Sequence, residues 1–74
     1  MMTYSDVQNV IVRYAPEMAQ PFADGFSRFP VGGNAAMIVN YLNEKAQFYY
    51  NINKEVAELL AAAASEIIIR SDRR

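Results

Sequence analysis

The chain has 74 residues, a formal net charge of −1, no cysteine and no histidine. A chain of this length forms one small domain, expected here over residues 1–74, and such a domain often needs oligomerisation to bury enough apolar surface. The missing cysteine and histidine exclude disulfides, most zinc, haem and iron–sulfur sites, and the Ser/His and Cys/His nucleophile arrangements. We therefore expect no cofactor and no metal.

Glu55 and Glu58 are three residues apart on a predicted helix and could be mistaken for a pair of catalytic carboxylates. Acidic residues at this spacing more often form a solvated stripe, or one that faces a partner. The sequence contains no phosphate-binding loop and no metal-ligand spacing beside them. We therefore expect a protein that is not an enzyme.

Basic side chains are scattered along the chain, whereas nucleic-acid binding is usually marked by a basic face or stripe. The cluster Arg70, Arg73 and Arg74 has Asp72 within it and is typical of a solvated helix end. The longest apolar run, Leu59 to Ala64, is far shorter than the roughly 20 residues of a membrane span. We therefore expect neither a nucleic-acid partner nor a membrane span.

The first half of the chain predicts a helix over about residues 5–28 that is kinked by proline. Ser5 followed by Gln8 has the spacing of a capping box at the start of a helix. Pro16 removes a backbone donor and disfavours helical geometry at the residue before it, and Pro21 repeats the problem. The pattern fits either one kinked helix or two short ones.

A turn is predicted over residues 30–33. Proline ends the first helical region, and two glycines permit left-handed backbone angles. The asparagine that follows is a good N-cap for the next helix. The turn residues are Pro30, Gly32, Gly33 and Asn34. A loop this short implies an antiparallel helical hairpin, so the expected fold is all-α.

One long, uninterrupted second helix is predicted over about residues 34–70, because this stretch has no glycine or proline. At about 1.5 Å per residue it would be roughly 55 Å long, longer than any helix that the first half could supply as a partner. Mostly apolar residues recur three and four apart, as in an a/d seam. The predicted seam, which we expect to pack between subunits, is Val39, Leu42, Ala46, Tyr49, Asn53, Val56, Leu60, Ala63 and Ile67.

Three features of this helix each fit two interpretations. Asn53 in the seam either sets the register and the number of subunits or reaches solvent at the edge of a short hairpin. Ala61 to Ala64 is either a strongly helical stretch or a surface for close helix approach. The aromatic residues 48–50 cannot share one face, so they form either a hairpin core with one partly exposed ring or packing surfaces on more than one side.

The segment Lys45 to Asn53, which reads KAQFYYNIN and is followed by Val56, resembles the second helix of type III secretion needle subunits. In that family an aromatic-rich stretch leads to a Tyr-Asn-Ile-Asn pattern, and two aliphatic residues lie near the C-terminus, as Ile67 and Ile68 do here. Pro30 falls at the first proline of the family's turn. The resemblance covers about residues 30–70, while the prolines of the first half and the four alanines depart from it.

The resemblance implies a subunit that self-assembles into a hollow helical filament, which conducts unfolded proteins. It places Asn51, Lys54, Glu58 and Arg70 on the polar lumen. It also implies partners: copies of the chain itself, small export chaperones, and the tip and rod proteins of the apparatus. The expected location is extracellular or at the cell surface, and the N-terminal residues lack the basic and apolar regions of a cleaved signal peptide.

The alternative is a small helical interaction protein, such as a phage or bacterial inhibitor or adaptor, that works as a homodimer in the cytoplasm. It would pair two long helices along the seam. It would present Phe22, Phe26 or the C-terminal isoleucines to a target protein.

Overall fold

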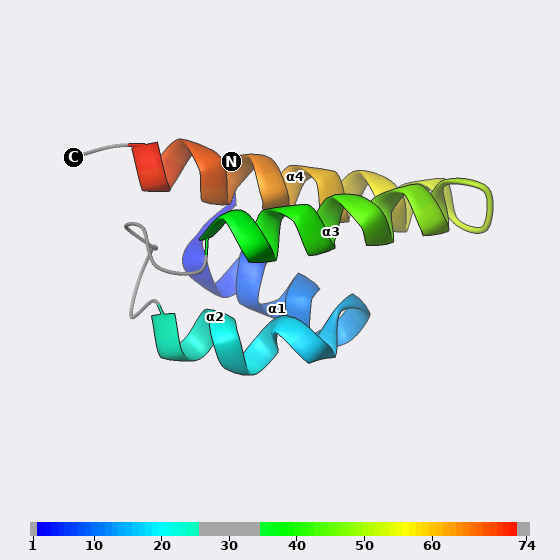
Figure 1. The fold of residues 1–74 in the computed structure, drawn as a ribbon. Coiled ribbons are helices and arrows are strands. Elements are labelled where there is room, and N and C mark those ends of the chain that lie inside the picture. Colours follow the sequence, from blue (N-terminus) through cyan, green and yellow to red (C-terminus); the bar gives the residue numbers. More distant parts are fainter. Residues whose placement is uncertain (1, 26–34, 73–74) are drawn as a thin grey trace.

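Helices make up almost all of the described part of the chain, which is residues 2–25 and 35–72 of a computed structural model. Figure 1 shows two layers, with α3 and α4 in one and α1 and α2 in the other. No strand occurs in these two described ranges, so the all-α class is confirmed. The elements are α1 (Tyr4–Tyr14), a 3-10 turn η1 (Pro16–Met18), α2 (Ala19–Gly25), α3 (Ala35–Tyr50) and α4 (Lys54–Asp72).

The single helix predicted over residues 34–70 is wrong, because α3 ends at Tyr50 and α4 begins at Lys54. The amides of Ile52 and Asn53 both donate to the carbonyl oxygen of Tyr49, at 2.8 and 2.7 Å, which closes a turn. Asparagine competes for backbone hydrogen bonds and favours caps and turns over helix interiors. Two asparagines around one isoleucine therefore end the helix without any glycine or proline.

An antiparallel helical hairpin is present, as predicted, but its two arms are α3 and α4, which lie side by side in Figure 1. The end of this hairpin that carries the 51–53 turn projects beyond α1 and α2. The predicted turn residues Pro30, Gly32, Gly33 and Asn34 lie outside the described residues, as does the expected end of the first helix at residue 28.

The predicted break near Pro16 is confirmed: α1 ends at Tyr14, and η1 begins at Pro16. The first half therefore forms two helices with a 3-10 turn between them. Pro21 lies in the first turn of α2, where a backbone N–H has no partner within the helix. The capping box lies two residues earlier than predicted, because the Thr3 hydroxyl accepts from the Asp6 amide and the Asp6 carboxylate accepts from the Thr3 amide, at 3.2 and 3.0 Å.

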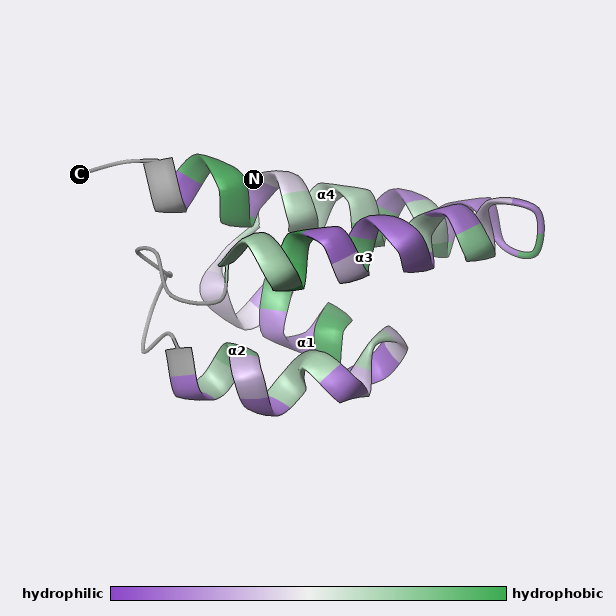
Figure 2. Cartoon of the chain, in the orientation of Figure 1, coloured by the Kyte–Doolittle hydropathy of each residue, from purple (hydrophilic) through white to green (hydrophobic). Residues whose placement is uncertain are grey.

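The core lies between the two layers. Figure 2 shows hydrophobic residues recurring between hydrophilic ones along α1, α3 and α4, which is the pattern of helices buried on one face. The ring of Tyr4 stacks on buried Phe22 with 5.0 Å between the ring centroids, which joins α1 to α2. The largest fully buried side chains, drawn from all four α-helices, are Val7, Ile11, Phe22, Ile38, Leu42, Leu60 and Ile67.

Candidate functional site

The predicted seam lies mostly inside one chain. Because the chain reverses at residues 51–53, the α3 half of the seam faces the α4 half and the first layer. A fully buried side chain such as Leu42 or Leu60 has no surface to offer a second copy, so these seam residues pack within one chain in this fold. The buried seam residues are Val39, Leu42, Val56, Leu60, Ala63 and Ile67, and Ala46 and Tyr49 pack partly buried against the same core.

Asn53 is exposed and has a local role. Its side-chain oxygen accepts from the amides of Glu55 and Val56, at 3.1 and 3.4 Å, so Asn53 is the N-cap of α4. Of the two interpretations offered for this residue, exposure at the edge of a hairpin agrees with the structure.

The residues assigned to a polar lumen do not form one stripe. Asn51, Lys54 and Glu58 are exposed near the turn. Arg70 lies at the other end of α4, about 24 Å from Lys54 at 1.5 Å per residue. Its Nε donates to the carboxylate of Glu66 at 2.9 Å, one turn back along the helix.

Three consecutive aromatic residues end α3, and they point in different directions. Tyr49 is turned inward, edge-on to Tyr14 with 6.0 Å between the ring centroids. Phe48 and Tyr50 on either side of it are 60% and 56% exposed, and Ile52 in the turn is 64% exposed. We call residues 48–53 the tip. The tip therefore presents large apolar side chains to solvent on several sides.

Lysines border the aromatic rings of this region. The Lys45 ammonium lies 5.8 Å from the ring centroids of both Tyr41 and Phe48, and the Lys54 ammonium lies 5.6 Å from that of Tyr50. Cations at this distance are attracted to the face of an aromatic ring. The exposed rings of Phe48 and Tyr50 therefore each have a lysine ammonium close by.

A groove of about 350 Å³ runs between α3 and α4 near the tip. Its floor is made by small side chains, which leave the hollow, and its lining is almost wholly apolar. The groove residues are Ala46, Gln47 and Tyr50 from α3, and Ala57, Glu58 and Ala61 from α4. Neither α1 nor α2 contributes to this lining, so the groove opens away from the first layer.

The four alanines therefore divide between two environments. Ala63 and Ala64 are buried, whereas Ala61 and Ala62 are exposed, and Ala61 lines the groove.

Ala57 and Ile52 were not among the predicted site residues. The available signal for Ile52 was its position between two asparagines, which marks a turn and therefore an exposed apolar residue.

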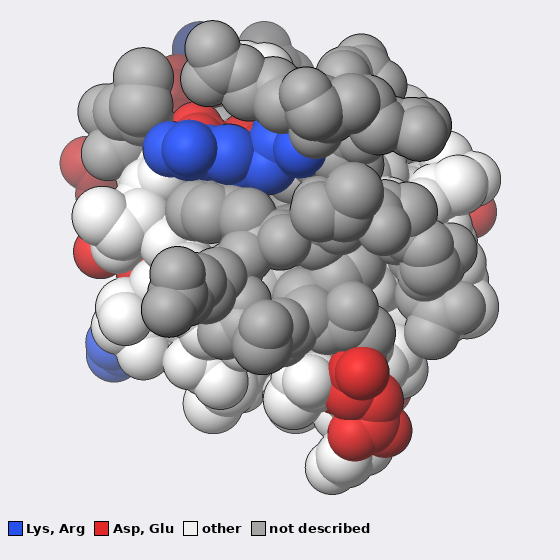
Figure 3. All heavy atoms as spheres, turned by 90° about the vertical axis from the view of Figure 1, so that its left-hand side faces the viewer, with Lys and Arg blue, Asp and Glu red and all other residues white. Residues whose placement is uncertain are grey.

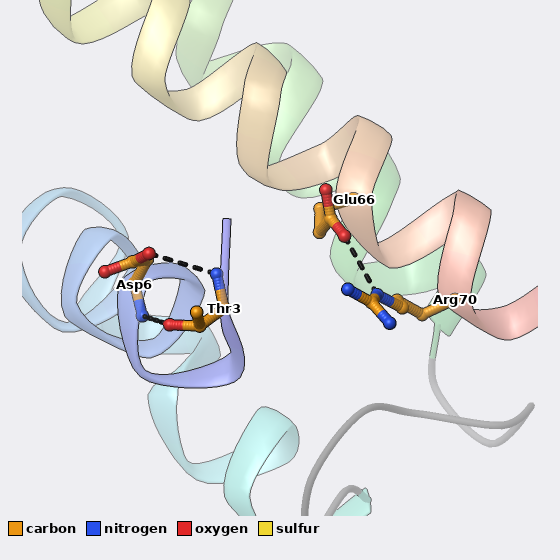
Figure 4. A network of polar contacts seen from close by, with 4 residues as sticks. All are labelled: Thr3, Asp6, Glu66 and Arg70. Atoms are coloured by element: carbon orange, nitrogen blue, oxygen red, sulfur yellow. Dashed lines mark hydrogen bonds and ion pairs between the residues drawn. The ribbon is translucent and has the colours of Figure 1, made fainter. Parts of the chain in front are cut away.

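Polar pairs link elements elsewhere in the molecule. The Tyr41 hydroxyl on α3 donates to the Glu17 carboxylate of η1, which raises the pKa of Tyr41. The backbone amide of Glu17 itself, and then Tyr41, hold the pKa of the Glu17 carboxyl below its usual range. Figure 4 shows two further pairs, Thr3 with Asp6 and buried Glu66 with Arg70. The Tyr41–Glu17 pair joins two elements, whereas the other two pairs are each local to one helix.

Charges of both signs stand near one another on the end of the molecule opposite the tip, where the described side chains form no large patch of one sign (Figure 3). Within the described ranges, no group of three or more acidic side chains is placed to hold a metal ion. No described helix is long and apolar enough to cross a membrane.

No protein-family model, no curated protein and no solved structure matches this chain. The resemblance of residues 30–70 to type III secretion needle subunits therefore stays a prediction. In this fold, the matching residues Tyr50 to Asn53 form the end of α3 and the turn into α4, not the middle of one helix.

Proposed function

We propose that this chain is a small helical interaction protein that binds a partner protein with the tip of the α3–α4 hairpin. The observation that carries the proposal is the exposure of Phe48 and Ile52 on a segment that projects beyond the first layer. Apolar surface left in water costs roughly 25 cal/mol per Å² relative to burial. A partner that covers the tip recovers this free energy.

The shape of the tip favours a protein as the bound partner. Small-molecule sites are concave, whereas Phe48 and Ile52 protrude and can enter a pocket on another surface. Aromatic anchors at the centre of an interface, surrounded by polar groups, carry much of the binding energy in protein complexes. Lys45 beside Phe48 supplies a polar group of this kind. Such a protein would act in the cytoplasm, as an inhibitor or adaptor.

The test is photo-crosslinking in the cells that produce the protein. A photoreactive amino acid at Ile52 is expected to give a discrete adduct with another protein. The same amino acid at Asn40, which is exposed on α3 away from the tip, is the matched control and should give none. Equal adducts at both positions, or none at Ile52, would contradict the proposal.

Self-assembly into a hollow filament is a second proposal. The seam that first suggested it is used within one chain, but Ile68 and Ile69 are exposed near the end of α4 opposite the tip. Two different apolar patches at opposite ends permit head-to-tail contacts, which give open helical filaments when the rotation does not close. A role in type III secretion outside the cell rests on the resemblance of residues 30–70. Electron microscopy of concentrated protein tests this proposal: filaments support it, and particles of uniform small size contradict it.

A further inference from the structure

We infer that the α3–α4 groove is the interface of a homodimer, in which a second copy packs across a two-fold axis. This inference deepens the proposed function, on which it rests, by assigning the surface that joins the two copies and leaving Phe48 and Ile52 for the partner protein. It replaces the seam first expected to join subunits, most of which is buried within one chain.

The groove and its rim have complementary shapes. Ala46, Ala57 and Ala61 make a hollow, and the half-exposed ring of Tyr50 stands beside it. A two-fold interface uses the same patch on both subunits, so the patch must fit itself. Here each copy carries one exposed ring at the rim of the groove and one hollow, and the ring of each can enter the hollow of the other.

The charges at the groove are also self-complementary. Lys54 and Glu58 are exposed one turn apart on α4, and neither has a salt bridge within the described ranges. When two α4 helices pack antiparallel across a two-fold axis, Lys54 of one copy faces Glu58 of the second copy, and the reverse pair forms at the same time. Opposite charges placed in this way fix the register of an interface.

Shape and charge select the same register. Tyr50 ends α3 and Lys54 begins α4, so these two residues lie at the same level of the hairpin, while Ala46 lies level with Ala57 and Glu58. The register that pairs Lys54 with Glu58 of the second copy therefore places Tyr50 opposite the alanine floor. This agreement favours a second copy over a helix of a foreign protein. The rim carries charges of both signs, so it offers no patch of a single sign that would attract such a helix.

The first test uses two adjacent alanines. Sedimentation equilibrium should give twice the 8.4 kDa of one chain for the unchanged protein. Ala61→Glu places an unpaired charge in the groove and should weaken dimerisation by about 100-fold. Ala62→Glu is the matched control, because Ala62 is also exposed on α4 but does not line the groove, and it should leave the dimer unchanged. Circular dichroism checks that both variants keep their helices.

A monomer at all concentrations, or equal effects of the two substitutions, would overturn the inference. The second test reverses charges: Lys54→Glu and Glu58→Lys should each weaken the dimer by about tenfold, and the double variant should recover it because the pair is restored. A double variant weaker than both single ones would also overturn it. Photo-crosslinks at Ile52 report on the foreign partner separately, so failure of the dimer and failure of partner binding are distinguishable.

Discussion

The side-chain oxygen of Asn53 accepts the backbone amide of Glu55 at 3.1 Å, and this hydrogen bond marks the point where the chain reverses into α4. An N-cap satisfies a backbone donor that has no partner within the helix. The position of this cap decides that α3 and α4 are two arms of a hairpin and not one helix.

Asn53→Ala should lower the free energy of unfolding by about 1 kcal/mol, because alanine cannot accept the amides at the start of α4. Asn53→Asp keeps an accepting oxygen and should stay close to the unchanged protein. Urea unfolding followed by circular dichroism measures both variants. Equal stabilities of the two variants would show that the cap contributes nothing.

Leu60→Ala should lower the free energy of unfolding by about 2–5 kcal/mol, since it leaves a cavity in the core. The adjacent Leu59 is 41% exposed, whereas Leu60 is fully buried. Leu59→Ala is therefore the matched control and should lower the free energy of unfolding much less. Equal costs from the same urea experiment would contradict the orientation of α4 in this fold.

Protonation of the Asp6 carboxylate at low pH should remove its stabilising effect at the start of α1. Hydrogen bonds from the backbone amide and the hydroxyl of Thr3 hold the pKa of the Asp6 carboxyl below its ordinary value. A lowered pKa in the folded state means that the carboxylate stabilises folding above the ordinary pKa of about 4, and that this contribution is lost as the pH falls through the folded pKa. Asp6→Asn should therefore lose less stability than the unchanged protein between neutral pH and pH 3, as measured by thermal unfolding at each pH. An identical pH dependence would contradict this role of the Thr3–Asp6 pair.

Arg70→Ala should destabilise the protein by about 1–3 kcal/mol, because it leaves the buried Glu66 carboxylate without its ion pair. Adding Glu66→Leu to the Arg70→Ala variant removes the buried charge and should restore part of the lost stability. Thermal unfolding at neutral pH compares the single and the double variant. A double variant less stable than Arg70→Ala would show that Glu66 has a further structural role.

Local signals in the sequence predicted part of this fold. The helical spacing of apolar residues and the short predicted loop indicated the all-α class, and Pro16 indicated the break between α1 and α2, because proline lacks a backbone donor whatever the tertiary context. The sequence predicts a capping box at Ser5, whereas it lies at Thr3, since both residues are good caps and the sequence alone does not choose between neighbouring starts. The tip was missed, because its exposure follows from a reversal that was not predicted.

The amino-acid sequence by itself determined that this chain is helical, where proline interrupts it and which residues are apolar at helical spacing. Tertiary structure decided what these apolar residues pack against. A straight helix over residues 34–70 would keep a few more backbone hydrogen bonds, but Leu42 and Leu60 would then lie far apart along it, and the two halves of the helix could not pack against each other. Reversal at Asn53 gives up those bonds and buries both side chains, and burial of apolar surface outweighs the small differences in helix propensity at two asparagines.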